Sequence, residues 1–516
     1  MPTIHDPYDV AIVGAGAAAA LFAARIAEAG RSVVMLEAGP GWRLTDLASS
    51  QIWARRLKWG GPPVEQSGPD RVGHNFASGW GTGGAAIHHY GFWPRFRPSD
   101  FRLRSETGQG RDWPIDYADL APHYDTVQAE VGISGDAETE PGRPPGAPYP
   151  MPPLKTFAQA ARLRRGFEAL GMSVGPAPLA ITSDVFKGRP PCQYDGWCDA
   201  GCPIGSLANP QSTYLPRALA AGAEVRNRAM VVRVEHGANG PALHYRDAAG
   251  ETHVQPARRV VLAGAPVQNA RLLLASGDRG LGSRSGQLGR GFAAHLLANG
   301  HALFDERTEC HLGVSAGSQI SLDDYRKQRA DGPTGSIAWG IAPAMKPNDL
   351  IGLANTRADL FGAALHTFMA RAARHLATIN GIVETVPDPA NRIELGSSRD
   401  VHDMPSARIV YRIPDEAKRL WALANDRALE VLKAAGAREA WTVPAMAHAH
   451  LSGGTVMGRD PETSVADDMG RLHDAPEIRV AGAGLFPSIG ALSPTFTILA
   501  LADRSARALL GEIQAA

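Results

Sequence analysis

The sequence lacks several features that would place it in a broad class at once. No run of apolar residues comes near the roughly 18 needed to span a bilayer, and the N-terminus lacks the charged-then-apolar layout of a signal peptide. Lys plus Arg and Asp plus Glu both total 52, so no excess of positive charge recruits nucleic acid or an anionic membrane. We therefore expect a soluble cytoplasmic protein. The alternative that the sequence leaves open is a periplasmic protein, exported in folded form with a partner that carries the signal.

Cysteine is also scarce, but three of the four cysteines are clustered. Cys192, Cys198 and Cys202 lie in the segment CQYDGWCDAGCP, with five and three residues between them. Such a loop can hold three thiolates around an iron–sulfur cluster. The other interpretation is a tight turn with reduced cysteines, or with one disulfide, and the residues alone leave both open.

The stretch from Asp9 to Gly39 has the pattern of a nucleotide-binding βαβ unit. An apolar run meets the turn Gly14-Ala15-Gly16, and an alanine-rich helical segment then leads to a second apolar run that ends at Glu37 and Ala38. Glycines in such a turn let the backbone approach a pyrophosphate at the positive end of the helix, and Ala19 stands where the third glycine usually does. A carboxylate at Glu37 accepts hydrogen bonds from a ribose diol and repels a 2′-phosphate, so the pattern favours FAD or NAD over NADP.

Two further segments place small residues where a flat or anionic ligand needs close backbone contact. The loop from Trp80 to Tyr90 reads WGTGGAAIHHY, and residues 258–264 read RRVVLAG, a buried strand that ends in a turn at Ala263 and Gly264. A helix follows this turn, so the second segment adds a strand beside the first βαβ unit. Residues 225–235 alternate and predict a strand pair joined by a turn.

With these motifs on view, the chain resembles the glucose–methanol–choline (GMC) oxidoreductases, a family of FAD-dependent alcohol and sugar oxidoreductases. The similar stretches follow the family's order along nearly the whole chain: GAGAAAA, WGTGGAAIHHYGFWPR, DWPIDYADLAPHYD, VVLAGAPVQNARLLLASG, HLSGGTVMGRDPETSVADDMGR and IRVAGAGLFPSIGALSPTFTILALADR. The cysteine loop and the TYLPRA after it are similar to the branch of membrane-associated sugar and sugar-acid dehydrogenases. Some of these carry a three-iron cluster and pass electrons to a cytochrome, often with an extra adjacent cysteine that this chain lacks.

The resemblance implies catalytic roles for three residues. His450, in the motif HxxGG, corresponds to the active-site histidine near the flavin N5, where a base accepts the hydroxyl proton while hydride leaves the same carbon. His448 lies two residues earlier and points the same way on an extended strand, either as a helper or as a core or surface residue. Ser493 stands where the family usually has His or Asn, and its hydroxyl can orient a substrate oxygen but is a poor base at neutral pH.

The resemblance also implies a set of residues that contact FAD. His88 lies where some relatives attach the flavin covalently through a histidine, and a non-covalent contact or simple packing are the alternatives that the adjacent His89 leaves open. Val232 lies on the strand that runs near the adenine in relatives. The full set is Gly14, Gly16, Ala19, Glu37, Ala38, Trp80, Gly81, Gly84, Ala85, His88, Val232, Ala263, Gly264, Gly482, Ala483, Pro494 and Thr495.

We predict an α/β fold with two discontinuous parts. Residues 1–115, 205–299 and 441–516 form a Rossmann-like FAD-binding domain, and residues 116–204 and 300–440 form an α+β substrate-binding domain with an antiparallel sheet and cap or loop excursions. Short apolar runs at 337–341 and 408–413 and helices near 360–375 and 416–435 indicate this second part.

Three functions fit these motifs. The first is an FAD-dependent dehydrogenase that oxidises a sugar, glycoside or other alcohol and passes electrons to a quinone, a dye-like acceptor or a protein such as a cytochrome, with a small subunit as a further partner. The second is an oxidase that makes hydrogen peroxide, and the third is a lyase in which FAD is structural. The cysteine loop favours the first. Flavin bleaching by substrate distinguishes the lyase from the other two, and rapid reoxidation by air singles out the oxidase.

Overall fold

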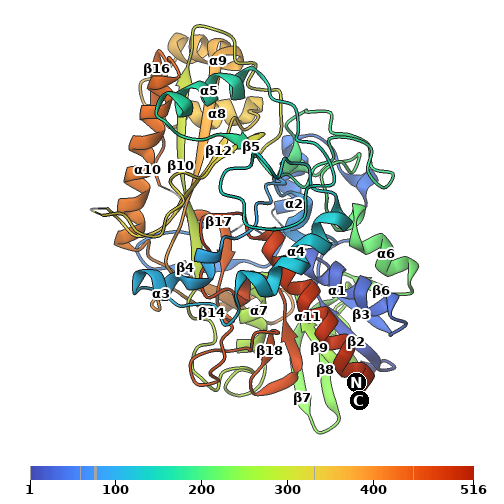
Figure 1. Ribbon diagram of the computed structural model, residues 1–516. Coiled ribbons are helices and arrows are strands. Elements are labelled where there is room, and N and C mark those ends of the chain that lie inside the picture. The colour runs from blue at the N-terminus through green and yellow to red at the C-terminus, as the bar shows by residue number, and fades with distance from the viewer. Residues whose placement is uncertain (1, 59, 75–77, 331, 446, 516) are drawn as a thin grey trace.

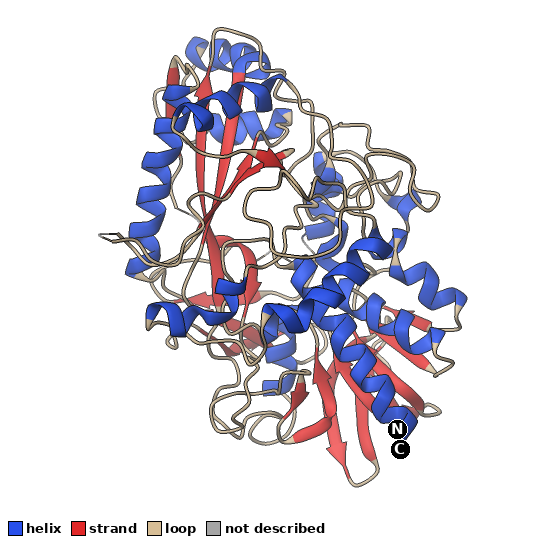
Figure 2. Ribbon diagram, in the orientation of Figure 1, coloured by secondary structure: helices blue, strands red, loops and turns tan. Residues whose placement is uncertain are grey.

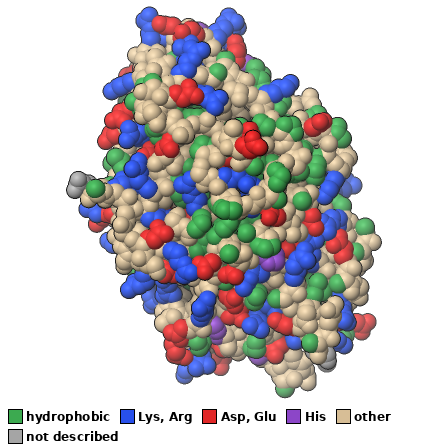
Figure 3. Space-filling model, in the orientation of Figure 1, with side chains coloured by type: hydrophobic (Ala, Val, Ile, Leu, Met, Phe, Trp, Pro, Cys, Tyr) green, Lys and Arg blue, Asp and Glu red, His purple; other side chains and the backbone are tan. Residues whose placement is uncertain are grey.

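The structure is a computed structural model that describes residues 2–58, 60–74, 78–330, 332–445 and 447–515. Helices and strands are mixed throughout, as the sequence predicts (Figure 2). Two large sheets stand one above the other in Figure 1, and long loops join them. On the face shown in Figure 3, basic and acidic side chains intermingle, in agreement with the balanced charge of the chain.

The lower sheet in Figure 1 has nine strands and a parallel centre. Its central strands are almost entirely apolar because helices or loops cover both faces, and side chains of the middle strands are buried in an unbroken row. The path across it is β18 (Arg471–Leu472), β19 (Ala475–Val480), β9 (Thr252–Leu262), β2 (Tyr8–Val13), β3 (Val33–Glu37) and β6 (Glu224–Asn227), joined at one side by β1 (Thr3–Ile4), β7 (Met230–Gly237) and β8 (Gly240–Arg246).

Three helices follow turns at the carboxyl ends of these strands. Helix α1 (Ala17–Glu28) follows β2, α7 (Ala265–Leu274) follows β9, and α11 (Thr495–Ala515) ends the chain. Helix α1 packs between α6 (Tyr214–Ala220) and α11, and α4 (Tyr117–Val131) covers α11 in turn. The predicted βαβ unit is therefore present, and β9 pairs in parallel with β2 as the second motif indicates.

The predicted hairpin at residues 225–235 is wrong. This segment contains two strands, but β6 pairs in parallel with β3, whereas β7 pairs with β8. A short extended strand can pair with any complementary edge, and β6, with the sequence EVRN, adds to the edge of β3. The local pattern predicted the two strands but not the strands with which they pair.

The upper sheet is antiparallel and has seven strands. Its strands are β16 (Glu439–Thr442), β10 (Ala293–Leu303), β13 (Leu376–Val383), β12 (Ile337–Ile341), β11 (Gln319–Ser321) and β5 (Gly175–Pro176), with β17 (Ala447–Ser452) also paired to β10. Helices α10 (Asp415–Ala434) and α5 (Ala158–Ala169) pack on one face of this sheet. The fully buried ring of Trp339 lies in the core on that side and contacts Phe167 of α5.

The remaining elements surround the two sheets. Strand β15, predicted within the antiparallel sheet, belongs instead to a separate three-stranded sheet, because it pairs with β14 and with β4 from the N-terminal part of the chain. These elements are β4 (Val64–Ser67), β14 (Arg392–Arg399), β15 (Pro405–Val410), α2 (Gln51–Lys58), α3 (Leu103–Thr107), α8 (Pro347–Ala354) and α9 (Ala363–His375). Among the described helices, none is both long enough and apolar enough to cross a bilayer.

Candidate active site

A cavity of about 400 Å³ opens at the carboxyl ends of the parallel strands, beneath the antiparallel sheet. The turns after β2, β3, β9 and β19 all contribute to its wall. This is the place where open parallel sheets bind nucleotides, because the turns there expose backbone amides and helix N-termini. The predicted residues that line it are Gly14, Gly16, Glu37, Ala38, Trp80, Gly84, Ala85, His88, Ala263, Gly264, Gly482, Ala483, Pro494 and Thr495.

The glycines of the first turn serve two different needs. Gly14 has a φ of 93°, and a Cβ there would lie 2.9 Å from the carbonyl oxygen of Ala263, so the close approach of β2 and β9 requires glycine. A Cβ on Gly16 would meet no protein atom within 4 Å. Gly16 therefore faces open cavity at the N-terminus of α1, and this space suits the pyrophosphate of a dinucleotide.

Glu37 is buried and holds three backbone segments together. Its Oε2 accepts a hydrogen bond from Ala15 N–H at 2.9 Å, and its Oε1 accepts hydrogen bonds from Gly39 at 2.8 Å and Gly81 at 3.1 Å. Burial raises the pKa of this carboxyl, and the three N–H donors act in the opposite direction. The carboxylate still lines the cavity, so its predicted contact with a ribose remains a prediction alongside this structural role.

The loop from Trp80 to Tyr90 forms one long wall, and two histidines hold it. His88 Nε2 donates to the carbonyl of Ser78 at 2.7 Å, and His89 Nε2 donates to that of Ala208 at 2.6 Å. Burial lowers the pKa of each histidine to about 4, so both are neutral at ordinary pH. His88 lies against the cavity, as a flavin contact requires, and covalent attachment there stays a prediction.

Three predicted contact residues do not form the wall of the cavity as the described residues define it. Ala19 is buried in α1 and faces the core. Gly81 instead packs against Trp42, which a Cβ would meet at 2.4 Å. Val232 is not among the lining residues, whereas its neighbours Ala229, Met230 and Val231 are, and the pairing of β7 with β8 shifts register between Val231 and Arg233.

The predicted catalytic residues His450 and Ser493 both lie on the cavity wall. His450 is on β17 with a φ of 53°, in the left-handed region, where the pairing of β17 with β10 shifts register. Such bulges re-aim side chains, and non-glycine residues in this region are concentrated at functional sites. The backbone of His448 is also in β17, but its side chain lies outside the described part of the structure, so its role stays a prediction.

A histidine that the sequence analysis did not select contacts His450 directly. His295 on β10 lies with its Nδ1 2.9 Å from Nδ1 of His450, and the two rings meet edge to face. Its Nε2 donates to the carbonyl of Gly490 at 2.8 Å, and its side chain is completely buried. Burial lowers the pKa of His295 to about 4. A single histidine within an apolar strand carries no motif, so only the pairing of β10 with β17 reveals it.

The antiparallel sheet forms the side of the cavity opposite the nucleotide turns. Leu297, Gly340, Asn380 and Ile382 line it from three neighbouring strands. Asn299 pairs with Asn380 across β10 and β13 and so lies on the same face of the sheet. This wall combines apolar side chains with amides, a combination that is usual in pockets for small molecules.

The cysteine loop lies close behind the cavity. Ser315 N–H donates to the sulfur of buried Cys198 at 3.5 Å, and Asp199 pairs at 3.2 Å with Lys58, which lines the cavity. Burial raises the pKa of Cys192 to about 12 and of Cys198 to about 11, so these are protonated thiols in the protein alone. All four cysteines are described and none is in a disulfide. The sulfurs of Cys192, Cys198 and Cys202 are not all within 4.8 Å of one another, so a single ion does not fit among them as they stand.

A cavity at the carboxyl ends of parallel strands, beneath an antiparallel sheet and with a histidine where the two meet, fits an enzyme that uses a dinucleotide cofactor. Comparison with known proteins agrees. Models of the N- and C-terminal parts of the GMC oxidoreductases match residues 152–297 and 387–502. The chain belongs to the GMC oxidoreductase family and is an FAD-dependent oxidoreductase that acts on CH–OH groups, since this family uses FAD and acts on sugar or other alcohol substrates.

Individual relatives extend over almost the whole chain. The large subunit of fructose dehydrogenase from Gluconobacter japonicus is 28% identical over 98% of this chain and 98% of that protein. Paromamine 6′-oxidase from Streptomyces fradiae is 30% identical over 98% of this chain and 92% of that protein. An FAD-dependent oxidoreductase from Chaetomium thermophilum has the same fold, with a TM-score of 0.71, 14% identity and coverage of 98% of this chain and 100% of that one.

Proposed function

We propose that the protein is an FAD-dependent dehydrogenase that oxidises a CH–OH group of a sugar, glycoside or other polyol and passes the electrons to an acceptor other than oxygen. The observation that carries this proposal is the placement of His450 on the cavity wall, between the nucleotide turns and the amide-bearing sheet. Named substrates of the relatives, fructose and paromamine, support a polyhydroxylated substrate.

Oxidation of an alcohol to a carbonyl removes a proton from oxygen and a hydride from carbon. Bound FAD supplies the acceptor for the hydride. His450 takes the hydroxyl proton: the O–H bond breaks and an N–H bond forms on the imidazole. Ser493, two residues before α11, donates to or accepts from a substrate oxygen and orients it, but does not act as the base.

The sheet wall would bind the rest of the substrate. Asn380 lines the cavity, and Oδ1 of its neighbour Asn299 is buried without a hydrogen-bond partner among the described residues. Amide groups can donate to and accept from the hydroxyls of a polyol. Leu297 and Ile382 would contact its carbon face.

The cofactor would be held by the turns that line the cavity. Gly14, Gly16 and Gly264 would let backbone amides approach its phosphates, and Gly482, where a Cβ meets no protein atom within 4 Å, would leave room for it. Residues 1–115, 205–299 and 441–516 would form the FAD-binding domain, and residues 116–204 and 300–440 the substrate-binding domain. Glu37 and Ala38 would lie at the ribose.

The acceptor is the finer part of the proposal. Cys192, Cys198 and Cys202 would hold an iron–sulfur cluster, which would supply one-electron chemistry between the flavin and a cytochrome or a small partner subunit. The donor set of three thiols near the cavity supports this, and the relative from Gluconobacter japonicus is itself named as a large subunit. Co-export with such a partner would place the protein in the periplasm.

Anaerobic stopped-flow mixing of the FAD-loaded protein with fructose, gluconate and a panel of polyols and amino sugars tests the proposal. We expect at least one of them to bleach the flavin in wild type and to do so at least about a hundredfold more slowly in His450→Ala. Slow reoxidation by air and fast reoxidation by a quinone would support a dehydrogenase. Rapid peroxide formation would show an oxidase instead, and a flavin that no CH–OH donor reduces would overturn the proposal.

A further inference from the structure

The contact between His295 and His450 depends on an irregularity in the sheet. Strand β17 pairs with β10 through Ala293 and Ser452 and then through His295 and Ala449, and the register shifts on either side of His295. His450 sits at this irregularity in the left-handed conformation. The local bulge turns its ring toward His295, so that two Nδ1 atoms lie 2.9 Å apart.

The hydrogen bonds decide which nitrogen of each ring carries a proton. A carbonyl oxygen can only accept, so His295 Nε2, 2.8 Å from the carbonyl of Gly490, carries a hydrogen. A neutral His295 then has a lone pair on Nδ1 and must accept a hydrogen bond there. The donor is Nδ1–H of His450, and in the neutral His450 ring Nε2 is consequently the basic nitrogen.

A buried polar network holds the carbonyl that orients His295. The hydroxyl of Tyr325 accepts a hydrogen bond from Ala491 N–H at 3.2 Å and donates to Asp100 at 2.8 Å. Gly490 packs so closely on this hydroxyl that a Cβ there would lie 2.8 Å from it. The backbone at Gly490 and Ala491 is therefore fixed against Tyr325.

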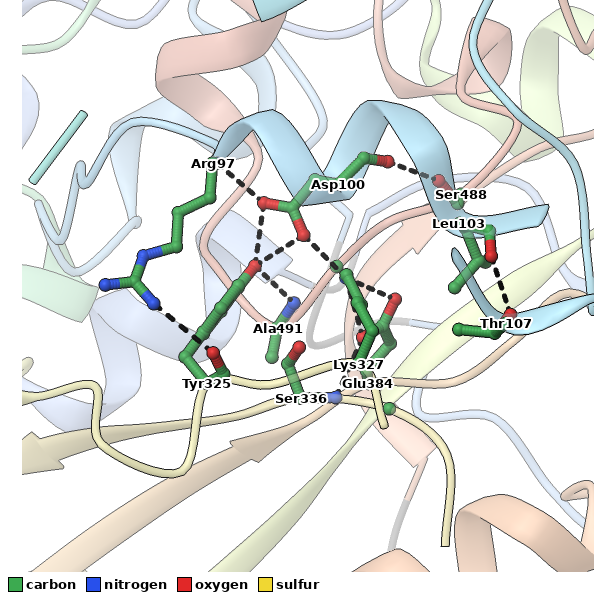
Figure 4. A network of polar contacts seen from close by, with 12 residues as sticks. Arg97, Asp100, Leu103, Thr107, Tyr325, Lys327, Ser336, Glu384, Ser488 and Ala491 are labelled. Carbon is green, nitrogen blue, oxygen red and sulfur yellow. Dashed lines mark hydrogen bonds and ion pairs between the residues drawn. The ribbon is translucent and has the colours of Figure 1, made fainter. Parts of the chain in front are cut away.

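Two ion pairs fix Tyr325 in turn. Lys327 Nζ lies 2.6 Å from Asp100 and 2.8 Å from Glu384, and Glu384 also accepts from Ser336 N–H at 2.8 Å. Figure 4 shows these side chains pointing toward one another from three segments far apart in the sequence. The three charged groups are fully buried, and a paired, hydrogen-bonded cluster of this kind has one geometry.

We propose that His295 is a positioning residue for the catalytic base: held by Gly490, it accepts Nδ1–H of His450 and so keeps Nε2 of His450 as the nitrogen that receives the substrate proton. This rests on the proposed role of His450. Ser493 also lines the cavity, but a serine hydroxyl does not supply a base. His295 orients the histidine from the opposite side, as a carboxylate orients the histidine of a catalytic triad.

The surroundings of His295 keep its ring neutral, so it does not exchange protons with the substrate itself. Burial is the largest cause of its lowered pKa, Lys327 lowers it further, and Asp100 raises it. The two charged side chains thus oppose each other. A neutral partner orients His450 but adds no negative charge beside it.

The test compares three variants with wild type in the FAD-loaded enzyme. His295→Leu removes the hydrogen bond, whereas His295→Gln can still donate to Gly490 and accept from His450. His301→Leu is the matched control, because His301 is also buried on β10 but bonds only Thr378 among the described groups. The readouts are flavin reduction by fructose, or by the fastest reductant of the panel above, and KM.

We expect His295→Leu to lower the rate of flavin reduction about 10- to 100-fold with KM nearly unchanged, as loss of an orienting partner usually does. His295→Gln should recover most of the rate, and His301→Leu should resemble wild type. Long-range ¹H–¹⁵N correlation of ¹⁵N-histidine in the wild-type enzyme should show a proton on Nδ1 of His450, and this measurement needs neither substrate nor a variant that folds.

Two outcomes would overturn the inference while leaving the proposed function intact. One is that His295→Leu reduces the flavin at the wild-type rate while His450→Ala is inactive. The other is an Nε2–H tautomer of neutral His450 in the spectrum. If His450→Ala reduces the flavin normally, the proposed base is wrong, and the inference fails with it.

Discussion

Oε2 of Glu37 accepts a hydrogen bond from the backbone N–H of Ala15 at 2.9 Å, which ties the end of β3 to the glycine turn after β2. The other carboxylate oxygen joins Gly39 and Gly81 to the same point. One buried side chain therefore sets the relative position of three segments around the cavity. The shape of the nucleotide site depends on it even before any cofactor is bound.

Replacing Glu37 with Gln should weaken FAD binding. The amide group of Gln has one oxygen and one N–H₂, so at least one of the three backbone donors would face another donor. We expect a cost of about 1–3 kcal/mol, or roughly a ten- to hundredfold weaker FAD affinity, from titration of the apoprotein followed by flavin fluorescence. Glu235→Gln, on the exposed face of β7, is the control. Unchanged affinity in Glu37→Gln would contradict this role.

Replacing Ser493 with Ala should have a small effect. Its hydroxyl lines the cavity but is a poor base, so we expect the rate of flavin reduction to fall by less than about tenfold. His450→Ala should slow the same step at least about a hundredfold. Single-turnover reduction under anaerobic conditions compares the two. Equal losses in both variants would show that Ser493 shares the proton chemistry.

Replacing Cys198 with Ser should remove iron from the protein purified without oxygen. Cys198 is the most buried thiol of the cysteine loop, and a cluster with three protein ligands does not survive the loss of one. Iron and acid-labile sulfide should be present in wild type and absent from the variant, with FAD retained in both. Cys310→Ser is the control, since Cys310 is buried elsewhere with its thiol directed at the carbonyl of Ala372. Wild-type protein with FAD and no iron would refute the cluster.

The stability of the protein should depend on pH through His301. Burial lowers the pKa of His301 from 6.5 to about 3, so the unfolded chain binds its proton first as the pH falls. The contribution of neutral His301 to the free energy of unfolding is therefore complete above pH 6.5. It is lost as the solution becomes more acidic, by about 2 kcal/mol over the first 1.5 pH units below 6.5. Thermal unfolding from pH 7 to pH 5 should show a shallower loss in His301→Gln than in wild type.

The control for this prediction is His366→Gln on the exposed side of α9. Its unfolding temperature should depend on pH as that of wild type does. Other buried histidines, His88 and His89 among them, have pKa values lowered to about 4 and add to the acid sensitivity of every variant. The difference between His301→Gln and wild type isolates one group. If the unfolding temperatures of these two proteins fell equally with pH, burial would not be lowering the pKa of His301.

The parts of the fold with a strong local signal were predictable. The turn at Gly14, the buried run of β3 and the strand–turn–helix at Gly264 appear close to their predicted positions, because glycine turns and continuous apolar strands depend on neighbouring residues. The predicted partner of β6 and the predicted sheet of β15 were wrong, because neither depends on neighbouring residues alone. Strand pairing is a long-range choice between edges, and an apolar strand does not encode which edge it joins.

The residues of the site also fall into two groups, those that the sequence selected and those that only the structure revealed. The spacing from the glycine turn was sufficient to select Glu37, and the resemblance of the C-terminal motifs to the GMC family selected His450 and Ser493. Only the tertiary structure decided that Val231 rather than Val232 lines the cavity and that His295 meets His450. These relationships depend on strand phase and on a register shift between β10 and β17, 155 residues apart at the contact, and packing alone sets both.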